Sequence, residues 1–135
     1  MAVVLTPESL DLQLHPEGGW FRETWRTTEV VATPHGERPL ATCIHFLLQP
    51  GERSTWHRVR SAEMWLWQGG GDLVLDLGGY GDQPARAHSV VLTTGSQHLV
   101  EPSAWQRAAP AADQAVLVAC VVSPGFDMAD FEIYG

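Results

Sequence analysis

The chain has 135 residues, and 16 acidic against 8 basic side chains give a formal net charge of -8 at pH 7. This length predicts a single domain over residues 1–135, because one hydrophobic core suffices for a chain of this size. The acidic balance argues against nucleic-acid and anionic-membrane partners, which are recognised through clustered basic side chains. We expect neither a signal peptide nor a membrane span, since the first residues lack a basic region and no apolar run is long enough.

The elements predicted in chain order are almost all strands. Thr6, Pro7 and Glu8 form a helix-start pattern, which predicts a short helix over residues 7–13. Aromatic and threonine residues predict a strand over 20–28, and regular alternation predicts another over 40–48. Further strands are expected at 54–59, 62–68, 72–77, 86–93, 97–101, 104–109 and 115–122. Many short strands at regular spacing indicate an all-β sandwich or barrel.

Strand alternation places the chemically interesting side chains on shared faces. His57 shares a face with Val59, and Glu63 shares a face with Trp65 and Trp67. If both faces point into a barrel, a histidine and a carboxylate meet among aromatic rings, as in a small-ligand site. The alternative is structural: the tryptophans form the core, and His57 and Glu63 are a buried, hydrogen-bonded pair. The alternation by itself leaves both interpretations open.

The spacing of Gly51, His57, Glu63 and Gly70 resembles the first cupin motif, with Val59 in place of the second metal-binding histidine. Landmarks along the whole chain are similar to those of a small family known as the fifth cupin domain family. They are HPEGGWFRETWR (residues 15–26), TCIHFLL (42–48), STWHRVRSAEMWLW (54–67), WQ (105–106) and CVVSPGFDMADFEI (120–133). The resemblance implies a double-stranded β-helix, or jelly roll, and a homodimer. The chain departs from the family pattern at residues 62, 66 and 101–103, which points to a narrower or drier site.

The motif positions also indicate whether a metal is expected. A bound metal would be held by His57, Glu63 and Gln106, which stands where the second cupin motif has a histidine. His45 would add a second nitrogen if its face of the strand is the interior one. One imidazole, one carboxylate and one weak amide oxygen are a poor ligand set for a transition metal. We therefore expect no metal and no other cofactor, with a hydrogen-bonded triad in the place of the metal.

The remaining chemistry is that of an acid and a base. His57, held in one tautomer by Glu63, is the candidate base for removing a proton α to a carbonyl, because imidazole exchanges protons near neutral pH. The expected function is that of a metal-independent isomerase, epimerase or lyase acting on a polar, sugar-like or carbonyl-containing metabolite. The alternative is a non-catalytic module that binds a small ligand. Candidate ligand contacts in either case are Arg22, His45, Trp65, Trp67 and Gln106.

Other segments carry weaker patterns. Residues 15–19 are typical of a structural tight turn, and residues 124–127 resemble a closing segment that covers the barrel mouth or joins a dimer interface. Arg22 alternates with aromatic residues, so it faces either an anionic ligand or surface ion pairs. Cys43 and Cys120 suit the reduced thiols of a cytoplasmic protein, although neighbouring strands could bring them together.

Overall fold

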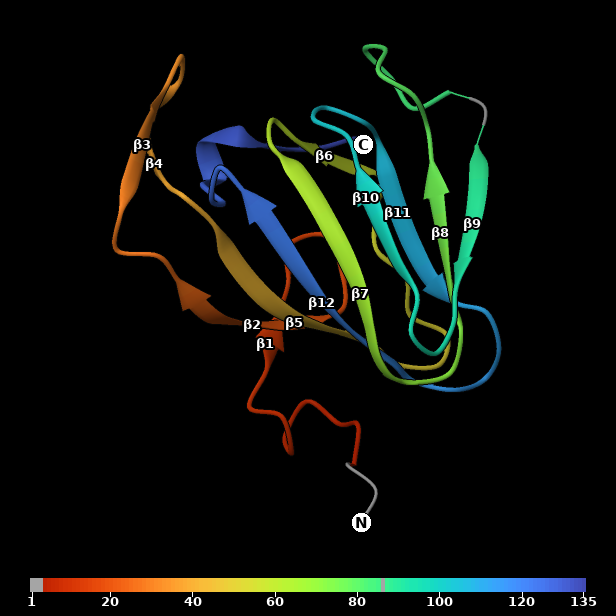
Figure 1. The fold of residues 1–135 in the computed structure, drawn as a ribbon. Helices are drawn as coiled ribbons and strands as arrows, with labels where there is room; N and C mark the ends of the chain where they lie inside the picture. Colours follow the sequence, from red (N-terminus) through yellow and green to blue (C-terminus); the bar gives the residue numbers. More distant parts are fainter. Residues whose placement is uncertain (1–3, 86) are drawn as a thin grey trace.

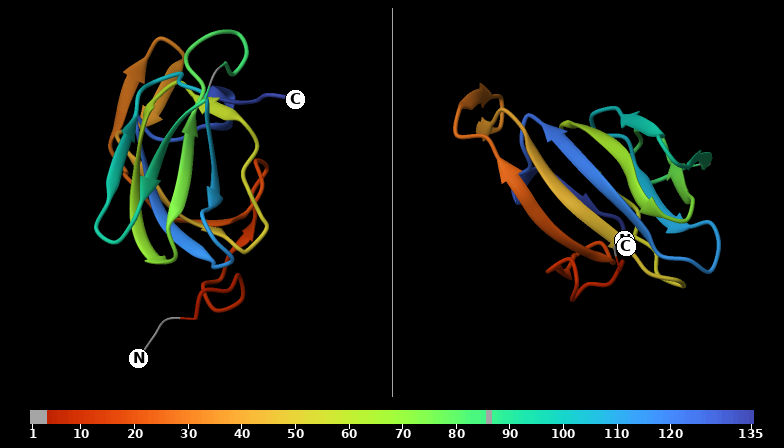
Figure 2. Two further views of the ribbon diagram at one scale, coloured as in Figure 1. Left: turned by 90° about the vertical axis from the view of Figure 1, so that its right-hand side faces the viewer. Right: turned by 60° about the horizontal axis from the view of Figure 1, so that its bottom comes forward.

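Two antiparallel sheets packed face to face form the body of the molecule (Figures 1 and 2). The computed structural model describes residues 4–85 and 87–135. One sheet has the strand order β1 (Gln13–Leu14), β2 (Trp20–Arg26), β5 (Thr42–Leu48), β12 (Val116–Ser123), β7 (Ala62–Gly70) and β10 (Gln97–Val100). The other has the order β13 (Phe131–Ile133), β6 (His57–Val59), β11 (Gln106–Pro110), β8 (Leu73–Leu77) and β9 (His88–Leu92). Neighbours along each sheet are mostly distant in sequence, as in a jelly roll.

The hydrophobic core lies between the inner faces of the two sheets. Alternate residues of β5, among them Phe46 and Leu48, point inward and meet Trp65 of β7 and Val118 of β12. Leu75 of β8 closes the same core from the second sheet. This arrangement confirms the all-β prediction, and its physical basis is the period-two alternation that the sequence displays.

The short helix predicted over residues 7–13 is wrong. Residues 6–11 form hydrogen-bonded turns, in which Leu10 N–H donates to the Thr6 carbonyl at 3.2 Å and Leu12 N–H donates to the Pro7 carbonyl at 2.8 Å. Asp11 then has a φ of 56°, a left-handed conformation that ends a right-handed helix. Gln13 pairs with Phe21 in β1, so the sheet extends the chain where the helix was expected.

Each of the strands expected from the alternation pattern is present, with boundaries that differ by a few residues. The hairpin of β3 (Val30–Thr33) and β4 (Gly36–Pro39) was not predicted, and neither were β1 and β13. These strands are short and mostly exposed, so burial leaves little alternation in their sequences. A single turn of 3-10 helix, η1 (Met128–Asp130), leads into β13.

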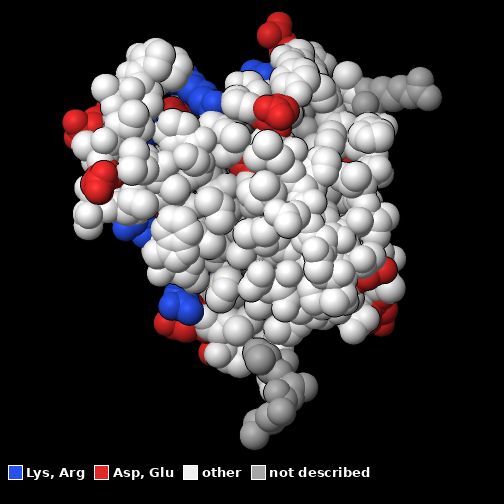
Figure 3. Space-filling view, in the orientation of Figure 1, with Lys and Arg blue, Asp and Glu red and all other residues white. Residues whose placement is uncertain are grey.

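The outer face of the six-stranded sheet is largely apolar. Over β5, β12 and β7 the surface is nearly free of charged side chains, which gather at its margins (Figure 3). Met64 and Leu99 are paired across β7 and β10 on this face, and Leu99 is 45% exposed. Within the described part of the chain, no helix has the length and apolar character needed to cross a membrane.

Candidate functional site

A small cavity of about 50 Å³ lies between the two sheets, under the C-terminal segment. Five histidine and glutamate side chains line it, all of them on strands or in the turn before β2: His15, Glu17, Glu23, His57 and Glu63. Its walls are mainly apolar, with Phe21, Ile44, Val59, Val122, Phe126 and Phe131. The prediction that His57 and Glu63 share one interior space is therefore confirmed in its geometry.

His57 begins β6, where pairing with Gln106 of β11 and Ile133 of β13 fixes its backbone. Its ring is buried, and Nδ1 donates to the Thr55 carbonyl at 2.8 Å. Oε2 of Glu17 lies 3.0 Å from the same nitrogen. Burial opposes the charged imidazolium, but the Glu17 carboxylate outweighs it, with smaller effects of Glu63 and Thr55, and raises the pKa of His57 to about 9. The ring is thus charged at neutral pH, and Nε2 is the nitrogen left for a ligand.

Glu17 is the main site residue that sequence reasoning missed. Residues 15–19 turn sharply because Gly18 and Gly19 have φ values of 105° and 78°, and a Cβ on Gly18 would lie 2.6 Å from the Arg53 carbonyl oxygen. Thr55 N–H donates to the Glu17 carbonyl at 2.6 Å, which docks the turn beside β6. The signal available in the sequence was an acidic residue directly before two glycines, in a segment that also carries the family resemblance.

The Glu17 carboxylate, not Glu63, occupies the position that orients His57. Because the Nδ1 proton of His57 points to Thr55, Glu17 Oε2 is at ion-pair distance but accepts no hydrogen bond from a described residue. His15 lies on the other side, with its Nδ1 3.4 Å from Glu17 Oε1. The backbone N–H of Glu17 donates to that same nitrogen at 3.1 Å, so Nδ1 is unprotonated and the pair is not an ion pair. Burial lowers the pKa of His15, in keeping with a neutral ring.

Glu63 sits at the end of a buried hydrogen-bond chain. Trp65 Nε1 donates to Gln106 Oε1 at 2.7 Å, and Gln106 Nε2 donates to Glu63 Oε1 at 2.8 Å. Burial raises the pKa of Glu63 to about 7, more than the His57 charge and the Gln106 amide lower it. This carboxyl therefore exchanges its proton near neutral pH.

The other predicted contacts are distributed over different parts of the barrel. Trp65 and Gln106 are fully buried and support Glu63 without lining the cavity. Trp67 packs against the core and donates its indole N–H to the Gly71 carbonyl at 2.8 Å. Arg22 and His45 are register partners on β2 and β5, on the face opposite the cavity-lining Phe21 and Ile44. Because side chains alternate along a strand, these two residues point away from the cavity.

The two cysteines also lie on opposite faces of neighbouring strands. Cys120 is opposite Ile44 and lines the cavity, whereas Cys43 is opposite Val121. Both thiols are free and buried. Burial, and then the Glu63 carboxylate, raise the pKa of the Cys120 thiol, which keeps it neutral.

The residues at the cupin metal positions do not fit a metal ion. Val59 offers no ligand atom, and the Gln106 amide oxygen is already taken by the Trp65 indole. In residues 4–85 and 87–135, no group of three or more His, Cys, Asp and Glu side chains has the arrangement of a metal site. The metal-free expectation nevertheless stays a prediction, for which elemental content of the purified protein is the test.

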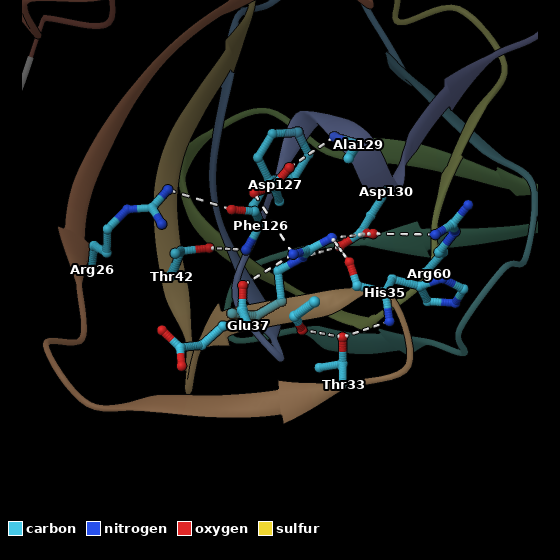
Figure 4. A network of polar contacts seen from close by, with 12 residues as sticks. Arg26, Thr33, His35, Glu37, Thr42, Arg60, Phe126, Asp127, Ala129 and Asp130 are labelled. Carbon is cyan, nitrogen blue, oxygen red and sulfur yellow. Dashed lines mark hydrogen bonds and ion pairs between the residues drawn. The ribbon is translucent and has the colours of Figure 1, made fainter.

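The C-terminal segment lines the cavity through Phe126 and Phe131. It is tied to the hairpin and sheet beside it (Figure 4). Phe126 N–H donates to Thr42 Oγ1 at 2.9 Å, and Arg26 donates to the Phe126 carbonyl at 3.3 Å. Arg38 of β4 donates to both carboxylate oxygens of Asp130, at 2.8 and 3.0 Å. These contacts hold Phe126 and Phe131 over the cavity.

Comparison with protein families identifies a match between residues 7–134 and the family described as "Cupin superfamily (DUF985)". The chain belongs to this cupin family. It is 31% identical to a hypothetical protein from Leishmania major, with a TM-score of 0.82 over 95% of this chain and 84% of the other. It is also 31% identical to a structural-genomics target from Shewanella oneidensis, with a TM-score of 0.84 over 96% and 82% of the two chains.

A more distant cupin neighbour shares the fold only. The oxalate decarboxylase of Lactobacillus farciminis, solved with formate, is 21% identical, with a TM-score of 0.64 over 90% of this chain and 33% of that enzyme. Comparison with curated proteins finds no match. The fold and family are therefore secure, whereas the reaction must be argued from the cavity.

Proposed function

We propose that this cupin is a metal-independent isomerase, epimerase or lyase that acts on a small polar carbonyl compound by proton transfer. The observation that carries the proposal is a buried histidine–carboxylate pair in which His57 is held charged by Glu17 while Glu63 titrates near neutral pH. Two titratable groups whose environments set different proton affinities in one cavity are a pattern of acid–base catalysis.

The geometry supports a division of roles between the two groups. On an α-hydroxy carbonyl compound, Glu63, as the carboxylate, removes the proton from the carbon that bears the hydroxyl, and His57 donates its Nε2 proton to the carbonyl oxygen, which yields an enediol. Glu63 then gives its proton to the former carbonyl carbon, and the hydroxyl on the neighbouring carbon gives its proton to His57 as it becomes the new carbonyl, which completes an isomerisation. This assignment differs from the one expected from the sequence, in which His57 was the base and Glu63 oriented it: Glu63 is now the base and His57 the acid, because Glu17 is the partner of His57 Nδ1.

The experiment is deuterium exchange, which requires no knowledge of the natural substrate. Small α-hydroxy carbonyl compounds are incubated with the protein in D₂O, and loss of the α C–H signal is followed by proton NMR. We expect exchange well above the protein-free rate, and a loss of about 100-fold or more in each of His57→Gln and Glu63→Gln, the usual size of general acid–base contributions.

Matched controls are His88→Gln on β9 and Glu101→Gln, both exposed and remote from the cavity lining. Equal exchange by the wild type, His57→Gln and Glu63→Gln would contradict the proposal.

A non-catalytic ligand-binding module is the second candidate. The observation that favours it is the small cavity, lined mainly by apolar side chains such as Phe126 and Phe131. A binder would take up a small compound, with saturable shifts of the cavity residues, and yet leave its α-proton unexchanged. The same NMR samples therefore separate the two functions.

We also infer a cytoplasmic homodimer. The apolar outer face of the six-stranded sheet, with Leu99 45% exposed, supports pairing with a second copy. The free, buried thiols of Cys43 and Cys120 support a reducing compartment.

A further inference from the structure

The Glu17 carboxylate is buried and forms an ion pair with His57, but no described residue donates a hydrogen bond to its Oε2. Only 6% of the residue is exposed, and it lines the cavity. Among the described residues none donates a hydrogen bond to Oε2, and the unprotonated Nδ1 of His15, which lies 3.4 Å from Oε1, donates none either. Buried carboxylates are normally satisfied by several donors, because leaving one unpaired is costly. The ion pair with His57 compensates the charge of Glu17 but leaves hydrogen-bonding capacity on Oε1, which a donor in the cavity would use.

His57, which also lines the cavity, needs a hydrogen-bond acceptor rather than a donor. Nδ1 of His57 is engaged by Thr55 and approached by Glu17, so the charged ring presents Nε2–H to a ligand. This donor requires an acceptor, such as a carbonyl oxygen. A ligand that satisfies both residues carries a hydroxyl group and a carbonyl group a few ångströms apart.

The charges around the cavity disfavour an anionic ligand. Glu17, Glu23 and Glu63 all line it, and the described lining contains neither Lys nor Arg. Arg26 is nearby, but its guanidinium is hydrogen-bonded to both oxygens of Glu23, at 2.9 and 3.1 Å. The His57 charge is balanced by Glu17. A carboxylate or phosphate would therefore enter without a free cation to pair with, and an ammonium group would meet the imidazolium.

The small size of the cavity favours a short ligand. A volume of about 50 Å³ accommodates roughly three to five water-sized groups, at about 10–15 Å³ for each. This is the number of non-hydrogen atoms in a three-carbon hydroxycarbonyl compound. The phenylalanine side chains of the wall suit its carbon atoms.

We propose that the cavity takes an uncharged α-hydroxy carbonyl compound of about three carbons, whose hydroxyl donates to Glu17 and whose carbonyl accepts from His57. This inference deepens the proposed function, since it rests on the same cavity and names the substrate class. It distinguishes this site from one that recognises a carboxylate.

The test compares three probes of similar size: hydroxyacetone, acetone and pyruvate. Each is titrated into ¹⁵N-labelled protein at pH 7, and the amide shifts of residues 15–19 and 57–59 are followed. Hydroxyacetone has the donor and the acceptor, acetone lacks the donor, and pyruvate replaces the donor by a carboxylate. We expect hydroxyacetone to bind at least tenfold more tightly than either of the others, as for a hydrogen bond to a charged group.

The Glu17→Gln variant should reduce the affinity for hydroxyacetone at least tenfold and should abolish its preference over acetone, because both probes use the His57 donor but only hydroxyacetone uses Glu17. The matched control is Glu8→Gln, an exposed residue of the N-terminal turn, which should change nothing. If Glu17→Gln does not fold, the three probes on the wild-type protein remain a complete test. Pyruvate binding as tightly as hydroxyacetone, a Glu17→Gln variant that keeps the selectivity, or no binding of any probe would overturn the inference.

Failure of this inference is distinguishable from failure of the proposed function. Hydroxyacetone that binds with the expected selectivity but shows no deuterium exchange supports the ligand class and contradicts catalysis. Exchange that depends on His57 and Glu63 for a carboxylate substrate supports catalysis and overturns the ligand class.

Discussion

Replacing Gln106 by Leu removes the centre of the hydrogen-bond chain that supports Glu63. Leucine fills similar volume, so the change isolates the polar contribution from the packing contribution. The Trp65 indole N–H, which now donates to Gln106 at 2.7 Å, would be left buried and unpaired. A stranded buried donor costs about 1–3 kcal/mol, and the lost bond to Glu63 adds about 1 kcal/mol, so we expect destabilisation of about 2–4 kcal/mol.

The same substitution changes the titration of Glu63. The Gln106 amide donates to Glu63 Oε1 at 2.8 Å and lowers its pKa, against the larger raising effect of burial. Without that donor, we expect the pKa of Glu63 to rise above its present value of about 7. Any deuterium exchange that requires the Glu63 carboxylate should then begin at higher pH than in the wild type.

Urea unfolding followed by tryptophan fluorescence measures the first effect, and carbon NMR of labelled glutamate measures the second. Gln97→Leu, an exposed glutamine on β10, is the matched control and should leave both quantities unchanged. A Gln106→Leu protein that is as stable as the wild type, with Glu63 titrating at the same pH, would refute the reasoning.

Three further predictions concern pH, the cover of the cavity and assembly. His57 and Glu63 both have a pKa in the folded protein above the ordinary value, so the folded state binds protons more tightly than the unfolded state. The free energy of unfolding should therefore fall as pH rises, from about 4.5 through 7 because of Glu63 and from about 6.5 through 9 because of His57. Urea midpoints at several pH values measure this, and a His57→Gln protein that still loses stability equally between pH 7 and 9 would contradict it. Asp130→Asn weakens the contact with Arg38, so hydrogen exchange of the backbone amides of residues 126–131 should accelerate. The control Asp113→Asn, in an exposed loop, should have no effect. Unchanged exchange in Asp130→Asn would show that the contact does not hold the segment. Light scattering should give the mass of a dimer for the wild type and of a monomer for Leu99→Asp. The control Val91→Asp, on the other sheet, should remain a dimer. A monomeric wild type would rule the dimer out.

The sequence indicated the strands and the inner residues well where burial is one-sided. Glu63 and Trp65 alternate with the less buried Met64 and Leu66 on β7. On β5 the inner Phe46 and Leu48 also alternate with residues of the other face, although Leu47 on that face is itself buried. Such alternation is a local property, because each residue of a strand points to the face opposite its neighbour. The same alternation predicted that His57 and Glu63 face one interior space, because each lies on the inward face of its strand.

Local patterns did not reveal which face of a strand is interior or what a turn contacts. His45 and Arg22 face outward because of how β2 and β5 pair and which sheet packs against them, and neither is written in the strand itself. The helix expected over residues 7–13 gave way to pairing of Gln13 with Phe21. An isolated short helix is only marginally stable, so such tertiary pairing decides the outcome.

The sequence alone determined that this protein is an acidic, all-β cupin with a histidine and a glutamate in its barrel and a valine at one metal position. Only the tertiary structure decided that Glu17, 40 residues before His57 in the chain, is the partner of that histidine. The reason is physical: the contact depends on a glycine turn folding against the segment that precedes β6, and no periodicity records a contact between a turn and a distant strand.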